Sequence, residues 1–302
     1  MQFSIIVPLY NKENFISNSI YSIINQNHKD FEILIINDGS TDNSLKNVEM
    51  IKDNRLRIIN QKNNGVSSAR NRGVSESKYD FVAFLDADDL WETDYLSEII
   101  KLIEDFPDCG LYTTSYISKR KDKQLDHRSK IVPNNFRGII DDYFDFINHN
   151  QAFCSSSVVA RKNIFEKVGL FPEGIIKRED YDTWIRFFLF SKIVFINSSL
   201  IIYLHDSQEK PYHKCDENFN YYDIEQLKKY LDMGLVKKEH QNNAKKYIIR
   251  HEIPILRRMI REKEIANAIS KIFIIWKIKH SRLKLIKLII KELLELKNHE
   301  EK

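Results

Sequence analysis

Residues 31–37 read FEILIIN, a mostly apolar run that ends at the polar turn Asp38-Gly39-Ser40. Short apolar runs with little alternation of polar residues are typical of strands buried on both faces of a parallel sheet. The sequence predicts further strands in the first half of the chain at Ser4–Tyr10, Arg57–Asn60, Phe81–Leu85 and Leu111–Ile117. A sheet therefore forms the centre of the predicted fold.

Apolar residues at helical spacing lie between these runs. The expected helices are Glu13–Gln26, Asp42–Lys52, Val66–Ser77 and Thr93–Glu104. Strands that alternate with helices indicate βαβ units, whose strands pair in parallel. We therefore predict an α/β fold with a mostly parallel, Rossmann-like sheet that is flanked by helices.

The pattern changes after about residue 120. The sequence predicts a charged loop at Lys119–Lys130, helices at Ile139–Ile147 and Tyr181–Phe190, and extended segments at Ser155–Ala160 and Ile193–Tyr203. From residue 219 to 302 the spacing is helical, and Pro254 is the only residue expected to break it. The sheet is thus expected to be followed by a C-terminal helical extension.

Composition excludes several classes of protein. The 302 residues are 42% hydrophobic and 30% charged, which rules out a chain that is disordered throughout. No apolar run approaches the roughly 18 residues that span a bilayer, and the N-terminus lacks the basic start of a secretory signal. The three cysteines lie too far apart to predict a disulfide framework or a CxxC site. We expect a cytoplasmic protein with reduced thiols.

The excess positive charge is confined to the end of the chain. The formal net charge is +4, and residues 271–302 alone carry nine Lys or Arg against four Glu. The other 270 residues carry 38 basic and 39 acidic side chains. Because nucleic-acid binding needs a broad basic face, this distribution predicts that the body does not bind nucleic acid.

Asp86-Ala87-Asp88 follows an apolar strand directly and is the most informative short motif. In an extended segment, residues i and i+2 point the same way, so the two carboxylates are expected to converge. Mg²⁺ and Mn²⁺ bind to a few carboxylates together with substrate phosphates. The alternative is a set of surface acids. No GxGxxG or GxxxxGK[ST] phosphate loop is present, so a nucleotide is expected to be held through metal and side chains.

Four ordered motifs carry a resemblance to a known family. They are Val-Pro-Leu-Tyr-Asn at 7–11, Asn-Asp-Gly-Ser-Thr-Asp at 37–42, residues 64–73 with the sequence NGVSSARNRG, and Leu-Asp-Ala-Asp-Asp at 85–89. Over residues 1–205 the chain resembles a family 2 glycosyltransferase of the GT-A fold. The resemblance implies a nucleotide-diphospho-sugar donor, usually a UDP-sugar, a divalent Mn²⁺ or Mg²⁺ ion, and inverting transfer of the sugar to a hydroxyl group.

The resemblance also implies a set of residues around the donor. They are Pro8, Tyr10, Glu13, Asp38, Asn64, Arg70, Asp86 and Ala87. In this set, Asp38 is expected to accept a hydrogen bond from the uracil N3–H, and Arg70 to lie over the nucleotide and diphosphate. Asp88 is expected to bind the metal ion, with His205 as a second candidate ligand; a structural role for His205 remains the alternative.

Glu179 and Asp180 resemble the acceptor-side motif of the family. Inverting transfer needs one base that takes the proton of the acceptor hydroxyl, and we expect Asp180 to be this base, with Glu179 as the alternative. Acidic residues are also common at helix N-termini for structural reasons, and Asp182 is expected to be only an exposed residue of the first helical turn. The expected organisation is a catalytic domain at 1–215, with a nucleotide half (1–118) and an acceptor half (119–215), and a helical region at 216–302.

The end of the chain combines charge with helical spacing. Leu283, Ile286, Ile290 and Leu293 recur at helical spacing among several lysines, a pattern typical of helices that lie on membranes or pack against partners. We expect peripheral membrane contact through residues 275–302, at the inner face of the cell membrane, or packing of this helix on the catalytic domain. With membrane contact, the acceptor is expected to be a glycan or a lipid-linked glycan of a bacterial surface polysaccharide.

Two other functions are compatible with parts of this pattern. A nucleotidyltransferase also uses metal and nucleotide on an α/β sheet, but it usually needs a glycine-rich basic loop near the first strand, and residues 8–13 contain none. An inactive sugar-binding subunit of a glycan synthesis complex is the other alternative. The presence of Asp38, Asp86, Asp88 and Asp180 together argues against it.

Overall fold

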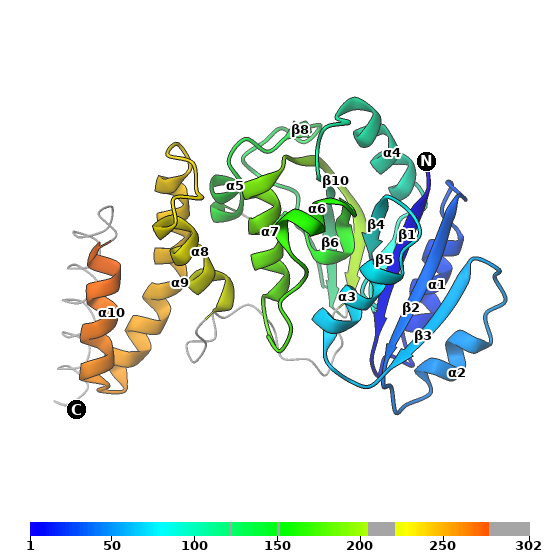
Figure 1. The fold of residues 1–302 in the computed structure, drawn as a ribbon, viewed down its shortest axis with the longest axis horizontal. Coiled ribbons are helices and arrows are strands. Elements are labelled where there is room, and N and C mark those ends of the chain that lie inside the picture. The colour runs from blue at the N-terminus through cyan, green and yellow to red at the C-terminus, as the bar shows by residue number, and fades with distance from the viewer. Residues whose placement is uncertain (121–122, 150–151, 205–220, 278–302) are drawn as a thin grey trace. The chain divides into compact units, whose positions relative to one another are not determined.

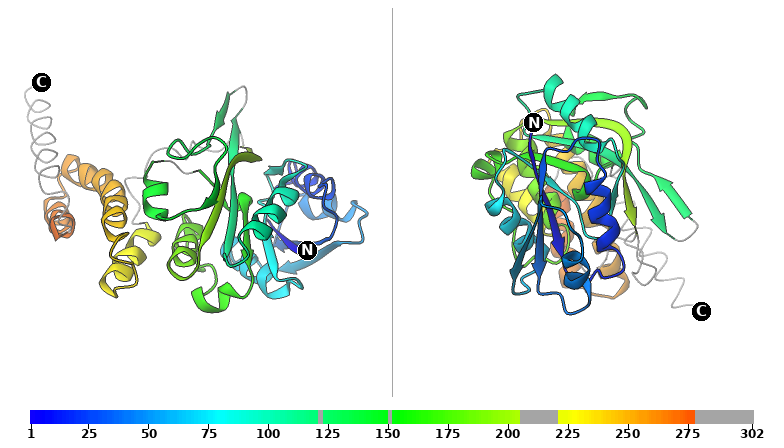
Figure 2. Two further views of the ribbon diagram at one scale, coloured as in Figure 1. Left: turned by 90° about the horizontal axis from the view of Figure 1, so that it is seen from above. Right: turned by 90° about the vertical axis from the view of Figure 1, so that its right-hand side faces the viewer.

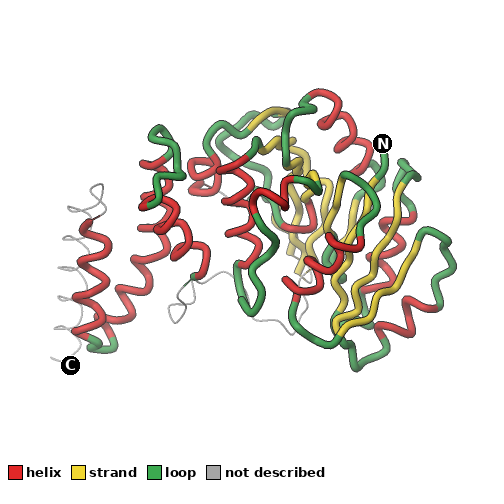
Figure 3. Tube along the Cα trace, viewed as in Figure 1, coloured by secondary structure: helices red, strands yellow, loops and turns green. Residues whose placement is uncertain are grey.

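The computed structural model describes residues 1–120, 123–149, 152–204 and 221–277. The chain divides into two compact units, Met1–Glu209 and Lys210–Lys302. The first unit holds all the strands of the described residues, and the second is helical (Figures 1 and 3).

One ten-stranded sheet organises the first unit. Its strands are β1 (Phe3–Leu9), β2 (Phe31–Asp38), β3 (Leu56–Gln61), β4 (Phe81–Phe84), β5 (Leu90–Trp91), β6 (Leu111–Arg120), β7 (Lys123–Asp126), β8 (Arg137–Ile139), β9 (Val158–Arg161) and β10 (Ile193–Leu204). The order is β3-β2-β1-β4-β9-β6-β10-β5, with β7 paired to β6 and β8 to β10. Strands β3, β2, β1 and β4 run parallel, whereas β9 is antiparallel to both of its neighbours.

Helices cover both faces of this sheet. They are α1 (Ile16–Ile24), α2 (Ser44–Glu49), α3 (Val66–Glu76), α4 (Tyr95–Asp105), α5 (Tyr143–His149), α6 (Ile164–Val168) and α7 (Glu179–Phe190), with a 3₁₀ turn η1 at Ser155–Ser157. Figure 2 (right) shows α1 and α3 on opposite sides of the first strands. This arrangement confirms the predicted α/β fold class.

The apolar runs of the sequence occur because helices cover both faces of the sheet. Phe3, Ile5 and Val7 of β1 belong to the same buried cluster as the apolar residues of α1 and α4. On the other face, Ile6 lies so close to α3 that a Cβ built at Gly73 would be 2.3 Å from the Ile6 Cγ2 atom. Successive strand residues point to opposite faces, so both sets are buried and no polar alternation remains.

Two secondary-structure expectations for residues 119–147 are wrong. The predicted loop at 119–130 is largely a hairpin, because β6 continues to Arg120 and pairs with β7 in antiparallel register. The predicted helix at 139–147 begins only at Tyr143, since residues 137–139 form β8 against β10. Both segments are strands at the margin of the sheet, where polar residues face water, and their sequences therefore lack an apolar run.

The second unit contains α8 (Tyr222–Asp232), α9 (Gln241–Arg261) and α10 (Ile265–Lys277). Pro254 lies inside α9 and does not end it, which corrects the expectation that it breaks the helix. Interior proline costs a helix about 3 kcal/mol, and burial of Leu256 and Ile260 against Ala268 and Ile275 of α10 offsets that cost. Among the described helices, none is long and apolar enough to cross a membrane.

Candidate active site

The carboxyl ends of β1, β2 and β4 meet at one edge of the sheet, where open α/β folds bind their ligands. At the end of β2, Asp38 is only 3% exposed. Its carboxylate accepts hydrogen bonds from the side chain of Gln61 and from the backbone N–H groups of Asn64 and Gly65, at 2.8–2.9 Å. Asp38 therefore fixes the loop between β3 and α3. A carboxylate has about four positions that can accept a hydrogen bond. One of them is left to accept a hydrogen bond from a nucleobase.

The other residues predicted around the nucleoside differ in how they are placed. Pro8 is buried inside β1, and Tyr10 just beyond it is 46% exposed. Glu13 accepts hydrogen bonds from the backbone and the side chain of Asn43 at 2.9 Å, so it ties the end of β1 to the start of α2. Asn64 is exposed, and its side chain faces solvent rather than the core.

Asp86, Ala87 and Asp88 form a turn, in which the Asp89 N–H donates to the Asp86 carbonyl at 3.0 Å. This corrects the expectation of an extended segment with two parallel carboxylates. Each carboxylate instead has its own cationic partner: Lys12 Nζ lies 2.6 Å from Asp88, and Arg70 lies 2.8 Å from Asp86. The Ala87 carbonyl accepts a 2.8 Å hydrogen bond from Ser19 of α1, which anchors the turn.

Arg70 is the buried cation of the site, at 3% exposed. Its Nη1 contacts the Glu179 carboxylate and its Nη2 contacts Asp86, both at 2.8 Å. Its guanidinium also lies 5.5 Å from the centroid of the Phe171 ring. Arg70 thus joins the turn after β4 to the start of α7. The contact of Arg70 with the nucleotide and diphosphate, which the resemblance implied, stays a prediction.

Asp89 and Ser156 are site residues that sequence reasoning missed. Ser156 Oγ donates to Asp89 at 2.5 Å and accepts from the Asp86 N–H at 3.1 Å, and Asp89 also accepts from the Leu204 N–H at the end of β10. Burial, together with the charges of Asp88 and Asp86, raises the pKa of Asp89 well above its ordinary value. The third acid within four residues after β4 was the available signal. The contact with η1 and β10 could not be read from local sequence.

Asp180 and Glu179 open helix α7 but occupy different environments. Asp180 accepts a 2.8 Å hydrogen bond from Ser155 Oγ and remains partly exposed. Glu179 is 7% exposed and paired with Arg70. Burial and the neighbouring Asp180 raise the pKa of Glu179 to about 7. Asp180 is therefore the more accessible of the two carboxylates. Asp182 is 2% exposed and paired with Arg186, which corrects the expectation that it is exposed.

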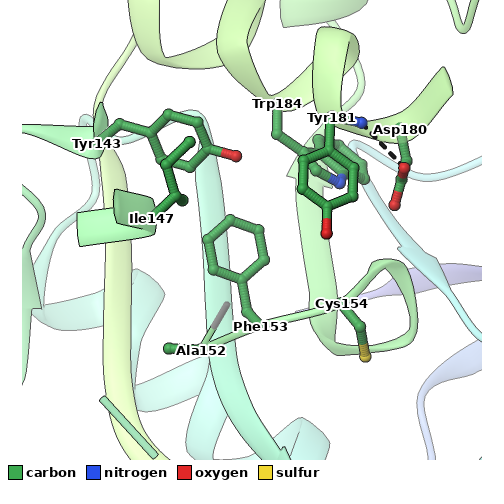
Figure 4. A pocket seen from close by; sticks show the side chains of 8 residues that line it. All are labelled: Tyr143, Ile147, Ala152, Phe153, Cys154, Asp180, Tyr181 and Trp184. Atoms are coloured by element: carbon green, nitrogen blue, oxygen red, sulfur yellow. Dashed lines mark hydrogen bonds between the residues drawn. The ribbon is translucent and has the colours of Figure 1, made fainter. Parts of the chain in front are cut away.

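A pocket lies beside Asp180, between α5 and α7 (Figure 4). It holds about 280 Å³ of empty space, including space that opens to solvent, and it is lined by Tyr143, Ile147, Ala152, Phe153, Cys154, Asp180, Tyr181 and Trp184. Asp180 lies at one side of this pocket, and half of the lining residues are aromatic. Sequence reasoning missed the pocket, because its walls come from α5, α7 and the segment before η1.

The residues present fit a divalent ion that also binds substrate phosphates. Among the described residues, no three His, Cys, Asp or Glu side chains gather as a complete metal site. Mg²⁺ needs only one or two protein carboxylates when phosphates supply other ligands, and Asp88 keeps 18% of its side chain exposed. Asp88 is paired with one cation of the chain itself, the ammonium of Lys12. His205 lies outside the described residues.

The model of glycosyl transferase family 2 matches residues 4–169, more than half of the chain. The chain belongs to glycosyl transferase family 2. An uncharacterized glycosyltransferase of Rickettsia bellii is 34% identical over 183 residues, which cover 60% of this chain and 26% of that protein. Glycosyltransferase GlyA of Streptococcus pneumoniae is 28% identical over 209 residues, 66% of this chain and 30% of GlyA. The chain thus spans about a quarter to a third of the length of these two family 2 relatives.

A solved structure shares the fold over nearly the whole chain. The crystal structure of S. aureus TarS residues 1–349 in complex with UDP-GlcNAc covers 94% of this chain and 92% of its own, with a TM-score of 0.61 and 17% sequence identity. The same fragment has also been crystallised with UDP. This likeness supports the GT-A fold predicted for the family 2 member described above.

Proposed function

We propose that this chain is a glycosyltransferase that moves a sugar from a UDP-sugar to a hydroxyl group with inversion at the anomeric carbon. The observation that carries the proposal is the double ion pair of Arg70, which links Asp86 to Glu179 at 2.8 Å each. Through this link, the next residues along the chain, Ala87-Asp88 and Asp180, belong to one site although they are about 90 positions apart. A donor side and an acceptor side are what group transfer requires.

Asp180 is the proposed general base. It is partly exposed and is held by Ser155 at 2.8 Å, so its carboxylate has a fixed direction before the acceptor binds. It would take the proton of the acceptor hydroxyl as the oxygen attacks the anomeric carbon and UDP leaves from the opposite face. Glu179 is less suited, because it is buried and already paired with Arg70.

Asp88, with Asp86, would hold a Mn²⁺ or Mg²⁺ ion against the donor diphosphate. When bound, such an ion offsets the charge that accumulates on departing UDP, which contributes several kcal/mol to the reaction. Lys12 would then share the same phosphates, because its ammonium already lies 2.6 Å from Asp88. Asp38 has one acceptor position left and would accept a hydrogen bond from the uracil N3–H. Pro8 and Tyr10 would contact the uracil ring.

We also propose that the acceptor is a glycan or lipid-linked glycan met at a membrane surface. Ile269, Phe273 and Trp276 recur at helical spacing on α10 and are 48%, 64% and 37% exposed. The sequence that follows α10 is rich in lysine and leucine. The predicted amphipathic stripe at residues 283–296 lies outside the described residues.

The direct test is UDP release from a panel of UDP-sugars in the presence of Mn²⁺, with EDTA as the second arm. The proposal expects slow hydrolysis of one donor, faster release with an acceptor, and loss of both in EDTA. UDP release that is unchanged by EDTA would contradict the proposed role of the metal ion. No release from any nucleotide-sugar would favour an inactive binding subunit.

A further inference from the structure

Three consecutive serines form the 3₁₀ turn η1 and are almost completely buried. Ser155, Ser156 and Ser157 are 4%, 0% and 0% exposed. A buried hydroxyl costs free energy unless it is hydrogen-bonded, whereas a small apolar side chain would pack there without that requirement. The hydrogen-bond partners of these hydroxyl groups therefore indicate what the serines contribute.

Ser156 contacts the turn after β4 on the donor side of the site. Its Oγ donates to the Asp89 carboxylate at 2.5 Å and accepts from the Asp86 N–H at 3.1 Å, so one hydroxyl group holds both ends of the turn that carries Asp88. The Ser156 carbonyl accepts the Trp91 indole N–H at 2.7 Å. This turn is thus attached to η1 at three points.

Ser155, the preceding residue, contacts the acceptor side of the site. Its Oγ donates to the Asp180 carboxylate at the start of α7 at 2.8 Å. Ser157 holds η1 itself, because its Oγ accepts from the Cys154 N–H at 3.1 Å and lies 2.9 Å from Thr113 Oγ1 of β6. One short turn that is tied to the sheet therefore contacts both sides of the site.

We infer that η1 sets the distance and direction between the turn after β4 and Asp180, and that Ser156 and Ser155 are its positioning residues. The inference rests on the proposed function, in which that turn holds the donor diphosphate and Asp180 is the base. Group transfer depends on this alignment, since a displacement of about 1 Å can cost about a hundredfold in rate. Adjacent residues of one turn keep the two sides at a constant spacing.

The test compares Ser155→Ala and Ser156→Ala with a matched control near the amino end of β1, away from the site. Ser4 is also 0% exposed, and its hydroxyl group makes the same pair of contacts as that of Ser156. It donates to the Glu32 carboxylate at 2.7 Å and accepts from the Tyr79 N–H at 3.1 Å. Urea denaturation measures the stability of each variant, calorimetry measures its affinity for UDP with Mg²⁺, and sugar transfer gives kcat.

Ser155→Ala should lower kcat about tenfold, the effect of losing a hydrogen bond to a charged group, and leave the UDP dissociation constant unchanged within about twofold. Ser156→Ala should lower kcat and raise the UDP dissociation constant, each about tenfold, because it releases the turn after β4. Ser4→Ala should destabilise the fold to a similar extent and change neither quantity. If Ser156→Ala does not fold, Ser156→Cys takes its place, since a thiol is a weak donor and acceptor of similar size.

The inference is overturned if the Ser156 variant matches Ser4→Ala in kcat and UDP affinity. It is also overturned if Ser155→Ala weakens UDP binding as much as it slows transfer, because the two serines would then not serve separate sides. If the wild type transfers no sugar while the Ser156 variant still binds UDP more weakly than Ser4→Ala does, the donor-side contact is supported and the proposed function is contradicted.

Discussion

Arg70 holds two carboxylates from a position that water hardly reaches. Removing one partner of a buried ion pair leaves an uncompensated charge and is far more costly than breaking a surface pair. A planar guanidinium can meet Asp86 and Glu179 with separate nitrogens at 2.8 Å, whereas an ammonium is a single point charge. At this scale the local motif predicted the residue but not its partner Glu179, which is 109 positions away.

Arg70→Lys tests this bridge. A single ammonium can pair with only one of the two carboxylates and leaves the other without its partner, so we expect a loss of up to about 3–5 kcal/mol in the free energy of unfolding, measured by urea denaturation. Arg72→Lys is the matched control, because the Arg72 side chain is 54% exposed in its pair with Glu76, and it should change stability by less than about 0.5 kcal/mol. Equal effects of the two substitutions would refute the bridging role.

Glu179 predicts a pH dependence of stability. Its pKa of about 7 in the folded chain lies above the ordinary value of 4.5. Between these pH values the folded state keeps a proton that the unfolded state has lost, so this group makes the free energy of unfolding fall as pH rises from 4.5 to 7. Glu179→Gln cannot titrate and should gain stability relative to the wild type over that window. A difference between the two proteins that is constant with pH would contradict the assignment.

Strands β1, β2 and β4 could be predicted because they are buried on both faces and their sequences are therefore apolar runs. β7 and β8 could not, since they depend on pairing with β6 and β10 rather than on local pattern. The turn after β4 was located by its acids, but its contacts with η1 and β10 depend on long-range packing. The pocket between α5 and α7 could not be predicted for the same reason, because its walls come from these two helices and from the segment just before η1.

Gly73→Ala tests the packing of α3 on β1. An added Cβ would meet Ile6 Cγ2 at 2.3 Å and Cγ1 at 2.9 Å in a close-packed layer, and overpacking of this kind costs about 1–3 kcal/mol. Denaturant unfolding should show this loss. In an Ile6→Ala background the same Gly73→Ala change should cost much less, because the clashing atoms are gone. An undiminished cost in that background would show that the clash is not the cause.

The two units of the molecule are predicted to have different functions. The first is expected to carry out the donor chemistry, and the second to bind to the membrane surface. Removal of residues 278–302 tests this division. Lys or Arg residues near an anionic leaflet contribute about 1 kcal/mol each, so the shortened chain should lose most of its co-sedimentation with anionic vesicles at low salt while UDP release persists. Binding of the full chain that does not respond to salt, or equal binding of both chains, would contradict the membrane proposal.

The central claim is that Asp180 removes the acceptor proton in a sugar transfer whose donor is held elsewhere. The measurement that tests it most directly compares Asp180→Asn with the wild type in sugar transfer and in UDP affinity. Loss of a general base costs about 10²–10⁴-fold in rate, while asparagine can still accept the Ser155 hydrogen bond. We predict a loss in that range with UDP affinity unchanged within about twofold. Normal transfer by Asp180→Asn would contradict the account, and loss of transfer by Glu179→Gln alone would move the base to Glu179.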